Sequence, residues 1–209
     1  MEEKSARVKA LAFLVITLSL YLLLWQLLNA FFSLPVYYYG RLIELLAVGL
    51  FAALAVHTPM KFAKMGIVSS RRTLLCSLAW GTAISLAAIA LLALLALFRG
   101  NDPLFSWHIW GDISRMTYFV VAPFQEILAK CVMLYTLEGC LENQHPRLAN
   151  LLSALVFGAF HVVYGPRMML LAMALSFLTG LLFLRHRSVW GCALVHFTLG
   201  FFPVCFGLA

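Results

Sequence analysis

The sequence predicts an all-α, polytopic membrane protein in which about seven transmembrane helices form one bundle. Hydrophobic residues make up 64% and charged residues 11% of the 209 residues, and the mean hydropathy is +0.96. Soluble domains average roughly 45–50% apolar and 25% charged residues, so an ordinary soluble domain is excluded. Apolar runs long enough to cross a bilayer follow one another along most of the chain. We therefore expect a single integral membrane domain over residues 1–209.

Long apolar runs at residues 10–32, 42–56 and 73–98 predict the first three spans. The first run is longer than the roughly 7–15 apolar residues of a secretory signal peptide, so we expect an uncleaved helix. The second run carries Glu44 three residues after Arg41. This spacing is typical of a structural ion pair, so we do not interpret Glu44 as catalytic.

Four further apolar runs predict the remaining spans, at residues 116–141, 148–163, 168–184 and 189–208. Short polar turns that contain basic residues separate these runs. Residues 99–115, which precede the fourth span, are polar but hold two tryptophans, and they predict a short helix at the membrane interface. The sequence contains no internal repeat.

Basic residues are distributed unevenly among the predicted loops. With the N-terminus on the cytoplasmic side, ten Lys and Arg residues fall in inside segments and four in outside segments. Cytoplasmic loops carry an excess of Lys and Arg, so we expect a cytoplasmic N-terminus. The net charge of +7 is therefore interpreted as an orientation signal and not as a surface for nucleic acid. The small size favours the inner (cell) membrane of a bacterium.

The fourth span contains a carboxylate, an amide and an amine within residues 121–130, VAPFQEILAK. A charge at the bilayer centre costs roughly 2.5–3.5 kcal/mol, so such residues rarely face lipid. Glu126 and Lys130 are four residues apart, which places them on one face of an α-helix. Pro123 is expected before the first full turn, where its missing N–H does little harm. A structural ion pair and a functional site both remain open.

Two later spans each contain a histidine without a charged neighbour in the same span. His161 ends the fifth span, with Phe157 one turn before it on the same face, and His196 lies in the seventh span. A lone histidine in a membrane often makes a structural hydrogen bond between helices. Two histidines and one carboxylate on three spans favour a shared site instead. We therefore expect Glu126, His161 and His196 to converge.

One carboxylate and two imidazoles permit a limited set of reactions. A carboxylate and an imidazole that share a water can remove its proton and generate a nucleophile. A second imidazole can donate a hydrogen bond to the oxyanion of the resulting tetrahedral intermediate. The same three residues could instead ligate zinc, because two His, one Glu and a water form a known catalytic set. The sequence lacks both the HExxH motif of zinc proteases and the GxSxG motif of serine hydrolases.

The order of these motifs resembles that of the CPBP intramembrane proteases, which include CAAX prenyl endopeptidases and bacteriocin-processing enzymes. The motifs are QEILAK at residues 125–130, FGAFH at 157–161 and HFTLG at 196–200. The resemblance covers about residues 120–200, within a motif-bearing core of about 116–209. It implies an intramembrane endopeptidase that acts on a peptide or protein in or at the membrane.

The resemblance also implies a role for each site residue. Glu126 and His161 would activate the water, and His196 would stabilise the oxyanion. Residues that would support the site or contact the substrate are Gln125, Lys130 and Phe157, the first two by holding Glu126 in place. No metal would be required, and zinc bound by the three catalytic residues is the alternative.

The sequence departs from the family pattern of EExxxR, FxxxH and HxxxN or a similar polar ending. Aligned on its basic end, the first motif has Gln125 in place of a glutamate and Lys130 in place of the arginine. A second register would put Glu126 in the first-glutamate position. Gly200 replaces the polar residue that follows His196, so one donor to the oxyanion or the substrate is missing.

These departures favour a non-catalytic alternative, in which a degenerate member acts as a membrane scaffold or binds a membrane partner. A transporter or proton relay is a further alternative, which the lack of repeats and of paired broken helices disfavours. The expected partners are a peptide or protein substrate and the lipid bilayer, without nucleic acid. No feature of the sequence indicates an oligomeric state.

Overall fold

The computed structural model describes residues 2–32, 34–57, 65–101 and 117–208, which form helices and no strand. In chain order the helices are α1 (Glu2–Phe31), α2 (Val36–His57), α3 (Arg71–Phe98), α5 (Tyr118–Glu126), the π-helix η2 (Ile127–Leu134), α6 (Tyr135–Cys140), α7 (Pro146–Ala159), the 3₁₀ helix η3 (Val162–Tyr164), α8 (Pro166–His186) and α9 (Trp190–Cys205). Each predicted span overlaps at least one of these helices, so the all-α prediction is confirmed. The interfacial helix predicted within residues 99–115 lies almost entirely outside the described residues.

Four helical segments are long and apolar enough to cross a bilayer, namely Ser5–Phe31, Arg71–Phe98, Tyr118–Cys140 and Pro166–His186. The polytopic membrane protein predicted from composition is therefore confirmed. α7 and α9 are shorter apolar helices of 14 and 16 residues. At 1.5 Å per residue α7 is about 21 Å long, whereas the hydrocarbon core is about 30 Å thick.

The predicted fifth span is wrong at its C-terminal end, because α7 stops at Ala159 and His161 lies in the turn that follows. After η3, Gly165 adopts a φ of 87°, a conformation that glycine tolerates without a steric penalty. Pro166 then begins α8 at a position where its missing N–H costs no hydrogen bond. This turn holds His161 outside a regular helix.

The predicted fourth span is one helical segment whose middle departs from α-helical geometry. Pro123 lies inside α5 and not before its first turn, so that expectation is wrong. From Ile127 to Leu134 the chain forms a π-helix, which is defined by i→i+5 hydrogen bonds and is frequently found at functional sites. Because Lys130 lies in this π-helix, the α-helical spacing expected between Glu126 and Lys130 is also wrong. That the two side chains lie on the same helix face stays a prediction.

The chain forms two compact units. Unit 1 comprises Met1–Met65 and Leu128–Leu181, and unit 2 comprises Gly66–Ile127 and Leu182–Ala209. The single membrane domain expected from the sequence stays a prediction.

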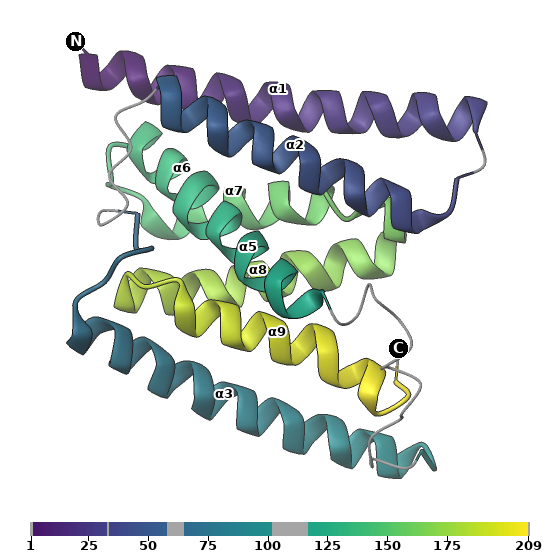
Figure 1. Cartoon of the computed structure of the whole chain (residues 1–209). Coiled ribbons are helices and arrows are strands. Elements are labelled where there is room, and N and C mark those ends of the chain that lie inside the picture. Colours follow the sequence, from purple (N-terminus) through teal and green to yellow (C-terminus); the bar gives the residue numbers. More distant parts are fainter. Residues whose placement is uncertain (1, 33, 58–64, 102–116, 209) are drawn as a thin grey trace. The chain divides into compact units, whose positions relative to one another are not determined.

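In unit 1, α1 lies alongside α2 (Figure 1). Buried polar side chains connect the later helices. The Asn150 side-chain amide donates to the Phe177 carbonyl oxygen at 2.9 Å, which joins α7 to α8. The Ser153 hydroxyl donates to the Ala129 carbonyl oxygen at 2.9 Å, which joins α7 to η2. Buried donors need such partners where water is excluded. These two bonds fix α7 against the segments that carry Lys130 and Ser176.

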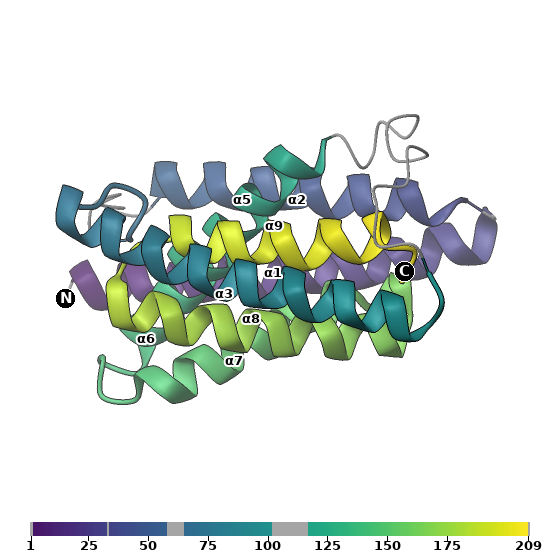
Figure 2. The same ribbon diagram turned by 90° about the horizontal axis from the view of Figure 1, so that it is seen from below.

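In unit 2, α3 and α9 lie side by side (Figure 2). They approach closely through small residues. Ser77, Gly81 and Ser85 recur every four residues along α3 and are buried. A Cβ added to Gly81 would lie 2.7 Å from the Gly191 carbonyl oxygen. The Gly191 N–H donates to the Ser77 hydroxyl, which in turn donates to the Ser188 carbonyl oxygen, each at 3.2 Å. This spacing of small residues is typical of tightly packed membrane helices.

The close packing of α3 on α9 predicts that Gly191→Ala destabilises the protein. The new Cβ would overlap the carbonyl oxygen and the hydroxyl of Ser77, and a backbone oxygen cannot rotate away. We expect the free energy of unfolding to fall by about 1–3 kcal/mol, the usual cost of overpacking. Reversible unfolding in mixed micelles of rising SDS content measures this free energy.

Gly49→Ala is the matched control, because a Cβ at Gly49 meets no atom within 4 Å. Its expected effect is neutral or stabilising by up to about 1 kcal/mol, since alanine favours helix more than glycine does. Equal stability of the two variants would contradict the packing of Gly191 against Ser77.

Candidate functional site

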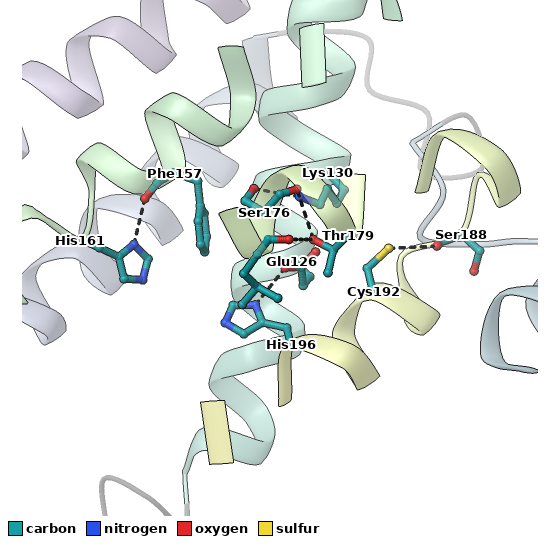
Figure 3. Close-up of polar contacts among 10 residues, drawn as sticks. Glu126, Lys130, Phe157, His161, Ser176, Thr179, Ser188, Cys192 and His196 are labelled. Carbon is teal, nitrogen blue, oxygen red and sulfur yellow. Dashed lines mark hydrogen bonds and ion pairs between the residues drawn. The ribbon is translucent and has the colours of Figure 1, made fainter. Parts of the chain in front are cut away.

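A buried hydrogen bond joins Glu126, the last residue of α5, to His196 in α9. The Glu126 Oε1 and His196 Nδ1 atoms lie 2.9 Å apart (Figure 3). Glu126 is fully buried, and His196 is 3% exposed. Both residues belong to unit 2, where α5 packs along α9. The structure thus brings together two of the three residues that the sequence predicted to converge.

The pattern of α9 explains why His196 faces inward. Cys192, Val195 and His196 follow the i, i+3, i+4 spacing of one helix face, and all three are buried. A buried carboxylate is costly unless a hydrogen-bond donor or an opposite charge compensates it. The His196 imidazole supplies that compensation to Glu126.

The hydrogen bond constrains where the protons of His196 lie. An ionised carboxylate only accepts hydrogen bonds, so beside ionised Glu126 the His196 Nδ1 carries a hydrogen and donates it to Oε1. Nε2 is then the ring atom that can meet a reactant. It accepts a proton when the ring is neutral and donates a hydrogen bond when the ring is protonated.

His161 is held by the residue one turn before it in the sequence. Its Nδ1 lies 2.8 Å from the Phe157 carbonyl oxygen (Figure 3). Because a carbonyl oxygen only accepts, Nδ1 is the donor and a neutral ring carries its lone pair on Nε2. The two rings also contact each other, with centroids 4.7 Å apart. Phe157 therefore fixes both the tautomer and the orientation of His161.

Lys130 is fully buried in η2 and donates to Ser176 of α8. Its Nζ lies 2.6 Å from the Ser176 carbonyl oxygen and 2.9 Å from the Ser176 hydroxyl. The Thr179 hydroxyl donates to the same carbonyl oxygen at 3.3 Å. Sequence reasoning missed Ser176, because a single serine inside an apolar helix becomes informative only through its contacts. The predicted role of Lys130 in holding Glu126 stays a prediction.

The remaining site predictions have different outcomes. Gln125 is half-buried beside Glu126 in α5, and successive helix positions point about 100° apart, so the two side chains leave the helix in different directions. His161 and Lys130 belong to unit 1, whereas Glu126 and His196 belong to unit 2. The convergence of His161 with the Glu126–His196 pair therefore stays a prediction.

A carboxylate and two imidazoles are donors that zinc accepts. Within residues 2–32, 34–57, 65–101 and 117–208, no three His, Cys, Asp or Glu side chains are grouped so that they could hold a metal ion. Metal-free catalysis and the zinc alternative both stay predictions.

Comparison with known proteins identifies the segment that carries the three motifs. Residues 113–202 match the family model described as type II CAAX prenyl endopeptidase Rce1-like. No curated protein and no solved structure matched the chain. The matched segment includes Glu126, His161 and His196. This motif-bearing part of the chain is thus similar to the Rce1-like type II CAAX prenyl endopeptidases, which confirms the resemblance predicted from the order of the motifs.

Proposed function

We propose that the chain is an intramembrane endopeptidase that hydrolyses a peptide bond in a membrane-associated peptide or protein. The observation that carries this proposal is the buried hydrogen bond between Glu126 and His196. The family match over residues 113–202 supports peptide hydrolysis, and the long apolar helices support a reaction at the membrane. The distribution of basic residues supports a cell-membrane protein with a cytoplasmic N-terminus.

Water is the nucleophile in the proposed reaction. Glu126 and His161 remove one proton from a water molecule while its oxygen attacks the carbonyl carbon of the peptide bond. The carbonyl oxygen becomes an oxyanion, to which protonated His196 donates a hydrogen bond from Nε2. Collapse of the intermediate re-forms the carbonyl and breaks the C–N bond. The departing amine takes up the proton that left the water.

The contacts of the two histidines support different roles for them, with His161 as a proton acceptor and His196 as a donor to the oxyanion. The His161 Nδ1 donates to a neutral carbonyl oxygen, so a neutral ring offers the Nε2 lone pair to a water proton. The His196 Nδ1 instead faces a carboxylate, which is a suitable counter-charge for an imidazolium. One ring is therefore suited to accept a proton and the other to stabilise negative charge.

The family description determines which substrate should be tested first. It names CAAX prenyl endopeptidases, so the first probe is a peptide with a prenylated Cys-aliphatic-aliphatic-X end. The same peptide without the prenyl group is the second probe, because our proposal specifies only a membrane-associated peptide or protein. The non-catalytic alternative, which Gln125 and Gly200 favour, predicts that neither peptide is cleaved.

Glu126→Gln tests the role of the carboxylate as a base. The substitution keeps the size of the side chain and its ability to accept a hydrogen bond, but it removes the basic group. We expect kcat for peptide cleavage in micelles to fall by about 10²–10⁴-fold, the usual contribution of a general base. A melting curve in detergent checks that the variant still folds.

Two further variants serve as controls for this substitution. Glu138→Gln removes another buried carboxylate from the same predicted span, and its kcat should remain near the wild-type value. Glu126→Gln/Lys130→Met removes the positive charge that the single substitution leaves buried. Cleavage that survives in both Glu126 variants would show that Glu126 is structural and is not the base.

A metal assay separates water activation by side chains from catalysis by zinc. Because the sequence lacks HExxH, we expect purified active protein to contain no stoichiometric zinc by elemental analysis. Incubation with 1,10-phenanthroline should leave kcat unchanged. One tightly bound zinc per chain, lost together with activity on chelation and restored with it, would establish the metal-dependent alternative.

A further inference from the structure

The space that a side chain at position 200 would occupy is filled by Tyr118. A Cβ added to Gly200 would overlap the hydroxyl oxygen and the ring of Tyr118. Tyr118 is the first residue of α5, Gly200 lies in α9, and both belong to unit 2. The phenol of Tyr118 therefore lies where any larger residue at position 200 would point.

This space adjoins His196. Gly200 follows His196 by four residues in α9, so the two positions lie on the same helix face, one turn apart. The Tyr118 ring meets the His196 ring edge-on, with centroids 6.0 Å apart and an interplanar angle of 70°. It also stacks against Phe197, with centroids 6.3 Å apart. These contacts hold Tyr118 beside the residue that is hydrogen-bonded to Glu126.

The hydroxyl of Tyr118 adds a donor that the ring contacts do not require. Phenylalanine would make both ring contacts equally well, so the hydroxyl can be removed without losing the packing of the ring. A phenol keeps its proton at neutral pH and can donate one hydrogen bond. Tyrosine hydroxyls are among the groups that stabilise oxyanions in enzymes.

We propose that Tyr118 is a further catalytic residue whose hydroxyl donates a hydrogen bond to the developing oxyanion beside His196. It supplies from α5 the donor that Gly200 cannot supply from α9. This inference rests on the proposed endopeptidase function. Gly200 stands where the family pattern has a polar residue. In this chain the donor would then come from Tyr118 and would not be lost.

Tyr118→Phe is the direct test, with cleavage of the prenylated and unprenylated peptides as the measurement. The substitution retains the ring contacts with His196 and Phe197 and removes only the hydroxyl. Loss of one oxyanion donor should lower kcat by about 10²–10³-fold with little change in KM. Tyr135→Phe removes a hydroxyl from α6 and should leave kcat unchanged.

A rescue experiment distinguishes donation from packing. Tyr118→Ala clears the space beside Gly200, and a second substitution then places a side chain there from α9. We expect Tyr118→Ala/Gly200→Asn to recover at least tenfold in kcat over Tyr118→Ala/Gly200→Leu. Asparagine and leucine have similar shapes, but only asparagine can donate a hydrogen bond.

The outcomes separate this inference from the proposed function. If Glu126→Gln is inactive while Tyr118→Phe keeps the wild-type kcat, the inference is overturned and the endopeptidase function stands. Equal activity of the asparagine and leucine double variants would also overturn it, because the hydrogen-bond donor would then be irrelevant. If folded wild-type protein cleaves neither peptide, both the proposed function and the role of Tyr118 are overturned.

Discussion

The buried hydrogen bond between Glu126 and His196 is the interaction on which the proposed chemistry of this chain depends. A carboxylate removed from water costs several kcal/mol unless a partner compensates it. The partner here comes from a helix 70 residues later in the sequence, so the bond fixes the end of α5 against the middle of α9. The same contact that makes Glu126 tolerable in an apolar protein also fixes the orientation of the His196 imidazole.

The position of His196 in turn depends on small residues. Gly191 and Gly81 allow α9 to approach α3 closely, and Gly200 allows the Tyr118 ring to lie against α9. Each of these contacts would be blocked by a methyl group. Because packed helices of this kind have little freedom to shift, the imidazole is held in one orientation, as the proposed oxyanion role requires. Such preorganisation is the main source of electrostatic stabilisation in enzyme active sites.

Hydropathy and motif order predicted much of this architecture, and the errors have identifiable causes. The apolar runs located the helices of the described residues, because in lipid only a helix satisfies all backbone polar groups within one segment. Hydropathy could not show that α7 ends at Ala159, since the residues that follow are equally apolar and the turn is set by Gly165 and Pro166. It also could not show the π-helix after Glu126, because the sequence does not change character there.

The site was predictable in its residue types but not in its partners. A charged residue in a predicted span indicates function, so Glu126, Lys130 and the two histidines could be selected from the sequence. Their partners Ser176 and Tyr118 could not, because a serine and a tyrosine are unremarkable in an apolar helix and become informative only through contacts. The absence of a polar residue at Gly200 suggested a missing donor, whereas the structure places a tyrosine in that space.

A double-mutant cycle between Glu126 and His196 tests the central claim most directly. The wild type, Glu126→Gln, His196→Asn and the double variant are compared by kcat for the same peptide and by free energy of unfolding. If the two residues act as one unit, the double variant should lose no more activity than the more damaging single variant, within about tenfold. Losses in kcat that multiply, with additive changes in unfolding free energy, would show two independent residues and would contradict the claim.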